Sequence, residues 1–145
     1  MTSYQHTQFG SAIVWPLIGA AAIGCAVAFI SPIMRVALLV AIPLALVAWT
    51  FSKLTITIDE HNVRAAFGPG FVYKQVPLTT IESCEPVRTH WLEGWGIHLS
   101  RFGWLYNVSG RDAVAIRLRN GKRFALGTDQ PEELAAAIRR LASAR

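Results

Sequence analysis

The sequence predicts a membrane-anchored, mainly β protein in which two transmembrane helices precede one compact antiparallel domain. Charge distribution is the first observation, because Arg35 is the only charged residue before Lys53, whereas all 9 acidic residues follow it. The second observation is a change of period, since apolar and polar residues alternate from Leu54 onward, as in strands that bury one face. We therefore divide the chain into an N-terminal tail at 1–10, a two-helix transmembrane hairpin at 11–51 and a β domain at 52–145.

The predicted membrane spans are two uncharged or nearly uncharged runs. Residues 11–30 form a run of 20 residues, the length at which a helix rising about 1.5 Å per residue crosses a hydrocarbon core roughly 30 Å thick. Residues 33–51 form a second, marginal run, and the turn between the two permits only an antiparallel hairpin. Lys53 and Arg64 after the second run outnumber Arg35 in the turn, which favours a cytoplasmic β domain.

Small residues recur at every fourth position in both runs, which places each set on one helical face. Such a pattern lets two helix backbones approach closely, although alanine and glycine are also simply common in membrane helices. The candidate helix-packing residues are Ala20, Gly24, Ala28, Ala37, Ala41 and Ala45.

The β domain is expected to contain about seven short antiparallel strands. Alternation and turn residues place them at 54–58, 63–67, 71–76, 80–87, 114–118 and 124–126, with one or two more between 91 and 110. Asn120-Gly121 marks the clearest hairpin. A C-terminal helix is expected at about 130–143, because Asp129 and Glu132 have capping-box spacing, and its apolar stripe would plug the end of a partly open barrel.

Several segments carry a resemblance to a known family. They are the helix pair, LTITIDEHNVRAAFGPG, GWGI at 94–97, GWLYNVSG at 103–110 and AVAIRLRNGKRFALGTDQPEELAAAI. Together they resemble bacterial membrane proteins that carry a pleckstrin-homology-like domain, a family largely without assigned function. The resemblance covers essentially the whole chain. It implies a pleckstrin-homology-like barrel capped by the C-terminal helix, and a multi-pass protein of the bacterial cytoplasmic membrane.

The wider superfamily usually binds phosphoinositides through basic residues around the turn that joins its first two strands. Here that turn, residues 59–62, reads Asp-Glu-His-Asn, and its carboxylates would repel a phosphorylated headgroup. We therefore do not transfer that mode of lipid recognition to this chain.

Aromatic residues cluster between 91 and 106, close to His90, His98 and Arg101. Trp and Tyr rings suit a protein-binding groove, and they equally suit a core packed against an irregular loop. The candidate partner surface consists of Trp91, Trp95, Trp104 and Tyr106.

Basic residues gather on the hairpin around Asn120-Gly121. The candidate contacts for anionic lipid headgroups are Arg117, Arg119, Lys122 and Arg123. Each charge contributes about 1 kcal/mol near an anionic surface. The alternative is a solvated strand edge, where charges prevent unwanted pairing. The formal net charge of +5 is modest, and we expect no nucleic-acid partner.

Residues that could supply metal ligands or acid–base groups are His90, Glu93, His98 and Asp112. They show no zinc-type spacing, and the chain has no GxSxG elbow or Gly-rich phosphate loop, so we expect no catalytic residue, metal or cofactor. The expected function is a non-enzymatic, membrane-tethered interaction module that binds the lipid bilayer as an integral protein and contacts a protein partner or its own copies. Peripheral recognition of anionic lipid is the first alternative, and an enzyme or metal protein is the second.

Overall fold

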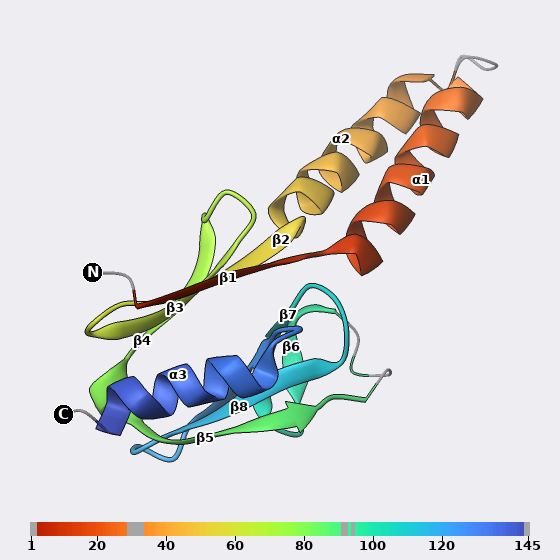
Figure 1. The fold of residues 1–145 in the computed structure, drawn as a ribbon. Helices are drawn as coiled ribbons and strands as arrows, with labels where there is room; N and C mark the ends of the chain where they lie inside the picture. Colours follow the sequence, from red (N-terminus) through yellow and green to blue (C-terminus); the bar gives the residue numbers. More distant parts are fainter. Residues whose placement is uncertain (1–2, 29–33, 91–92, 94, 144–145) are drawn as a thin grey trace.

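The computed structural model describes residues 3–28, 34–90, 93 and 95–143, whose arrangement is shown in Figure 1. The described strands are β1 (Tyr4–Phe9), β2 (Lys53–Ile58), β3 (Asn62–Phe67), β4 (Val72–Pro77), β5 (Ile81–Arg88), β6 (Gly96–Ser100), β7 (Gly103–Asn107), β8 (Asp112–Leu118) and β9 (Arg123–Gly127). The described helices are α1 (Ser11–Ala28), α2 (Met34–Thr50), the short 3₁₀ turn η1 (Leu78–Thr80) and α3 (Pro131–Ser143).

The first sheet is antiparallel and has the order β1-β2-β3-β4. Strict alternation along β2 and β3 places their apolar side chains on one buried face, as the sequence predicts. Residues 1–10 were expected as a tail, but Tyr4 to Phe9 form β1, which pairs with β2 from Tyr4 opposite Ile58 to Phe9 opposite Lys53. The two helices are therefore an insertion between two neighbouring strands of one sheet.

The second sheet has the order β5-β8-β9-β7-β6. Its pairs are antiparallel except for β7 and β9, which run parallel. The predicted hairpin around Asn120-Gly121 is confirmed as β8 and β9, and Gly121 takes the positive φ of 81° that this turn requires.

The core lies where the inner faces of the two sheets and α3 meet (Figure 1). Apolar side chains of β2, β3, β8 and β9 pack there against Leu134 and Ile138 of α3, both fully buried. The C-terminal helix predicted at about 130–143 is confirmed as Pro131–Ser143.

The predicted partly open, pleckstrin-homology-like barrel of about seven strands is wrong. The described residues form nine strands in two separately hydrogen-bonded sheets. The physical reason is a break in the ladder, because η1 separates β4 from β5, and β5 then pairs with β8 instead of continuing the first sheet.

The helices α1 and α2 pack side by side and project from the first sheet as an arm, which we define as residues 11–28 and 34–50 (Figure 1). Among the described residues, no helix combines the length and the apolar character needed to cross a membrane. This finding contradicts the predicted transmembrane hairpin, the integral bilayer contact and the multi-pass location in the bacterial cytoplasmic membrane. The described parts of these helices contain 18 and 17 residues, fewer than the roughly 20 apolar residues that a membrane-spanning helix typically contains.

Two glycines fix the base of the arm to the first sheet. Gly10 donates its N–H to the Ser52 carbonyl at 2.7 Å, and a Cβ at Gly10 would collide with the Phe51 carbonyl. Gly68, with φ of 48°, lies so close to α2 that an added Cβ would meet the Thr50 carbonyl oxygen at 2.5 Å. The base of the arm is therefore packed closely against the backbone of the first sheet.

Candidate interaction surfaces

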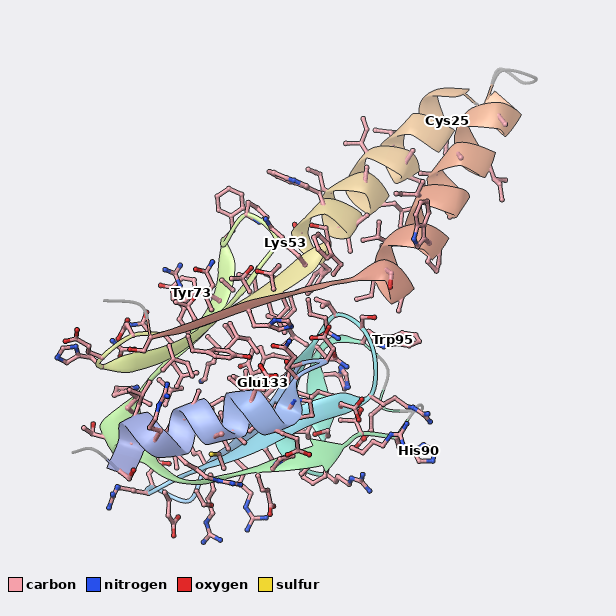
Figure 2. The ribbon with its side chains drawn as sticks, viewed as in Figure 1. Cys25, Lys53, Tyr73, His90, Trp95 and Glu133 are labelled. Atoms are coloured by element: carbon pink, nitrogen blue, oxygen red, sulfur yellow. The ribbon has the colours of Figure 1, made fainter. Side chains whose placement is uncertain are left out.

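The arm carries large apolar side chains on its outside. In Figure 2 Cys25 lies far out along the arm and Lys53 lies at its base, with apolar side chains pointing outward between them. Their exposed fractions run from 45% for Val47 to 71% for Leu39. The set consists of Trp15, Ile18, Ile23, Val36, Leu39, Val40, Ile42, Leu46, Val47 and Trp49. Arg35 is the only charged residue in the sequence of the arm.

The helices bury only a narrow strip against each other. The strip includes Leu17 and Ala21 on α1, and Leu44 and Ala48 on α2, which are less exposed than their neighbours and recur at helical spacing. Because the apolar residues surround each helix, this strip leaves most of them uncovered.

The structure describes the surroundings of four of the six small residues predicted for helix packing. Ala20 and Ala45 are exposed, Ala41 is half-buried, and a Cβ added at Gly24 would meet no neighbouring atom within 4 Å. The side chains of Ala28 and Ala37 lie outside the described residues. The close approach of backbones is instead found at the base of the arm, at Gly10 and Gly68.

Exposed aromatic rings continue the apolar surface of the arm onto the first sheet. Trp49 near the end of α2 and Phe71 beside the β3–β4 turn are 55% and 76% exposed, and their rings meet edge-on with centroids 6.3 Å apart. Phe9, which ends β1, is 72% exposed. The apolar surface therefore extends beyond the helices to the strand ends that carry them.

The predicted aromatic surface separates into residues with different roles. Trp104 on β7 is 53% exposed. Tyr106, two residues further, packs its ring against Phe67 and Phe124 at centroid distances of 6.4 Å, and its burial raises the pKa of the phenol. Trp95 donates its Nε1–H to the Gly110 carbonyl at 3.1 Å, which ties the loop before β6 to the loop before β8.

Trp91 lies outside the described residues. The structure adds Leu99, which the sequence interpretation missed. Leu99 is 72% exposed and lies directly opposite Trp104 across the β6–β7 pair, so the two side chains share one face at the edge of the second sheet. The alternation of Ile97 and Leu99 is the sequence signal that could have indicated a strand with Leu99 on one face. The interpretation of this segment rested on its aromatic residues instead.

The four basic residues predicted as headgroup contacts do not all lie together. Arg117 and Arg123 lie directly opposite each other across β8 and β9. Arg119 turns away and donates its Nε–H to the Thr79 carbonyl at 3.0 Å, and Lys122 is exposed at the turn. Arg117 and Arg123 therefore lie next to each other, whereas Arg119 and Lys122 lie apart from this pair.

Arg117 and Arg123 line a cavity of about 330 Å³. Arg139 of α3 lines the same cavity. Its Nε and Nη2 donate to the Cys84 carbonyl at 3.1 and 2.8 Å. A second cavity of about 270 Å³ lies between β5 and α3 and is lined by Arg119.

The residues considered for acid–base or metal chemistry make structural contacts. Glu93 accepts the N–H of His90 at 2.5 Å and the N–H of Arg101 at 3.4 Å. Burial opposes ionisation of Glu93, but these two hydrogen bonds and the Arg101 guanidinium lower its pKa. Asp112 pairs with Arg88 at 3.7 Å.

The His98 ring lies on β6, and its Nε2 is buried without a hydrogen-bond partner among the residues the structure describes. Within the same residues, no three His, Cys, Asp or Glu side chains come together as a metal site would require. His90, Glu93, His98 and Asp112 therefore form no common constellation in the described part of the chain.

No protein-family model matches the chain, and no curated protein matches its sequence significantly. The resemblance to bacterial membrane proteins with a pleckstrin-homology-like domain stays a prediction.

Proposed function

We propose that the protein is a non-enzymatic interaction module that pairs with a second copy of itself through the arm. The observation that carries the proposal is the large, nearly uncharged apolar surface on the outside of both arm helices. Soluble monomers rarely expose a contiguous apolar patch larger than a few hundred Å², and larger patches mark interaction sites.

Burial of this surface provides the driving force. Transferring one exposed Leu or Ile side chain from water to a fully buried site contributes about 1.5–3 kcal/mol. Leu39, Ile42 and Leu46 lie three to four residues apart along α2 and are each more than half exposed, so one approaching surface covers all three. A helix that is apolar all round is normally covered on every side, and the α1–α2 strip covers only one.

A second copy is the occupant that matches this surface best. A partner with a charged docking face would have to bury its charges unpaired against the arm, which is costly. An identical arm presents the same uncharged side chains, and two such hairpins related by a two-fold axis form a four-helix bundle with a common apolar interior. Arg35, near the start of α2, is the only charged residue that each arm would bring to such a bundle.

The sheets and α3 act as a rigid base in this proposal. The contacts of Gly10 and Gly68 fix where the arm leaves the first sheet, so the arm is presented to a partner in one orientation. Glu93 and Asp112 are engaged in structural contacts, which supports a binding role over a catalytic one.

Sedimentation velocity on the full chain tests the proposal with a matched pair of variants. Leu39→Glu and Leu99→Glu change the same residue type at the same exposure, 71% and 72%, but Leu39 lies on the arm and Leu99 on the edge of the second sheet. We expect a concentration-dependent dimer in the unchanged protein and in Leu99→Glu, and a monomer in Leu39→Glu. Unchanged far-UV circular dichroism in both variants controls for folding.

Three results would overturn the proposal. They are a monomer at all concentrations in the unchanged protein, a dimer lost only in Leu99→Glu, and flotation of the unchanged protein with lipid vesicles in place of dimer formation. The second result would assign self-association to the Leu99 and Trp104 edge.

A further inference from the structure

The cavity lined by residues of β5, β8, β9 and α3 is a second feature of the molecule, remote from the arm in sequence. Its volume of about 330 Å³ falls in the range of small-molecule pockets. Arg117 comes from β8, Arg123 from β9 and Arg139 from α3. Three arginines from three elements therefore line one partly open cavity.

In the absence of a ligand, repulsion between these cations destabilises the fold. Like charges directly opposite each other on neighbouring antiparallel strands are destabilising, and Arg117 and Arg123 occupy such positions. Glu82 offsets part of the repulsion, because its Oε2 lies 3.0 Å from Nε of Arg117. Arg123 forms no ion pair with another described residue, so an anion between the two guanidinium groups relieves the remaining repulsion.

Arg139 is held in a fixed orientation. Two of its donors are bound to the Cys84 carbonyl, and a guanidinium group has five donors, so others remain for a ligand. Guanidinium forks match the oxygens of a phosphate group in bidentate geometry, and a fixed fork loses less conformational entropy on binding.

The remaining lining of the cavity restricts what the phosphate can be attached to. Glu85 and Ser83 lie on the wall, and Phe102 adds an aromatic surface. A carboxylate repels a bare anion but accepts hydrogen bonds from hydroxyl groups, and a serine hydroxyl can donate or accept. We propose that the cavity binds a phosphate monoester of a hydroxylated small molecule, with the phosphate at Arg117, Arg123 and Arg139 and the hydroxyl groups at Glu85 and Ser83.

Calorimetric titration of the full chain with glycerol 3-phosphate tests the site. We expect saturable binding that weakens at least about tenfold in Arg123→Gln, because one charge-assisted contact is lost. Lys122→Gln is the matched control, since it removes one positive charge from the adjacent, exposed position of the same hairpin, and we expect it to bind like the unchanged protein. Thermal unfolding of both variants confirms that they fold.

Two outcomes would overturn the site. One is the absence of saturable heat with glycerol 3-phosphate in the unchanged protein. The other is equal weakening in Arg123→Gln and Lys122→Gln, which would show that only net charge attracts the probe. Glycerol without phosphate is expected not to bind, and inorganic phosphate is expected to bind more weakly than the ester because it lacks the hydroxyl contacts.

Phosphatidylglycerol vesicles distinguish a lipid headgroup from a free ester. Vesicle binding that is lost in Arg123→Gln and competed by glycerol 3-phosphate supports the site with a headgroup as its source. Binding of the ester without vesicle binding supports the site with a soluble ligand. Vesicle binding that neither the variant nor the ester changes, in a protein that does not bind the ester, contradicts it.

Discussion

Arg139 of α3 donates from both Nε and Nη2 to the main-chain carbonyl of Cys84, at 3.1 and 2.8 Å. Cys84 returns a contact, because its Sγ lies 3.5 Å from the Ala135 carbonyl oxygen in the same helix. The C-terminal helix is therefore joined to β5, an edge strand of the second sheet, by polar contacts at the margin of the core. The same contacts place the Arg139 guanidinium group at the proposed phosphate site.

Ionisation of the Cys84 thiol is expected to lower the stability of the fold at alkaline pH. Burial raises the pKa of this thiol, and the nearby Arg139 only partly offsets the effect. In the unfolded chain a cysteine ionises near pH 8.5, so the stabilisation is complete below about pH 8.5 and is lost as pH rises through the higher folded-state pKa. We expect the free energy of unfolding in urea to fall as pH rises above about 8.5, and to fall less in Cys84→Ala. Parallel curves for the two proteins would contradict this.

Gly103 begins β7 with φ of 92°, and a Cβ there would collide with the Arg123 carbonyl. We expect Gly103→Ala to lower the free energy of unfolding by more than Gly121→Ala does. Gly121 also has a positive φ, of 81°, but a Cβ there meets no atom within 4 Å, so it costs only the strain of about 1–2 kcal/mol. Chemical denaturation of both variants measures the difference, and equal losses would exclude close packing between β7 and β9.

Asp59 stabilises the β2–β3 turn through its carboxylate. Its Oδ1 accepts the N–H groups of His61 and Asn62, both at 2.7 Å, and these bonds lower the pKa of the carboxyl group. The stabilisation is present above the unfolded-state value of about 3.9 and is lost as pH falls through the lower folded-state pKa. We expect Asp59→Ala to cost about 1 kcal/mol at pH 7 and to show less loss of stability between pH 5 and 3.

Asp59→Asn serves as its control. The amide oxygen can accept the same two N–H groups but does not ionise in this range. We therefore expect stability at pH 7 close to that of the unchanged protein, combined with the weak acid dependence of Asp59→Ala. A strong acid dependence in Asp59→Asn would assign the effect to other carboxyl groups.

The sequence predicts those strands and helices whose alternating or helical apolar pattern lies entirely within the element itself. Strict alternation predicts β2, β3 and β8, Asn120-Gly121 predicts the β8–β9 hairpin, and the apolar stripe with its capping residues predicts α3. Tyr4 to Phe9 contain no alternating apolar pattern, and they form a strand because β2 offers a free edge. Pairing between β7 and β9 is equally invisible in the sequence, since it depends on two segments that meet only in the folded chain.

The apolar run at 11–30 led to the wrong structural class for a physical reason. Hydropathy reports that a segment avoids water, and it does not report how many of its residues are helical or what covers them. Only part of the cationic site could be predicted from the sequence. Arg117 and Arg123 follow from the hairpin, but Arg139 joins them only through the packing of α3 against β5.

The pairing of Phe9 with Lys53 brings the two ends of the helical insertion together at one end of the β1–β2 pair. Because Phe9 at the end of β1 lies opposite Lys53 at the start of β2, residues 10–52 are an insertion whose two ends lie side by side. Docking of β1 on β2 closes this loop, and prior formation of the two helices shortens the path that has to be closed. We therefore expect the helical insertion to form before the N-terminal strand completes its sheet.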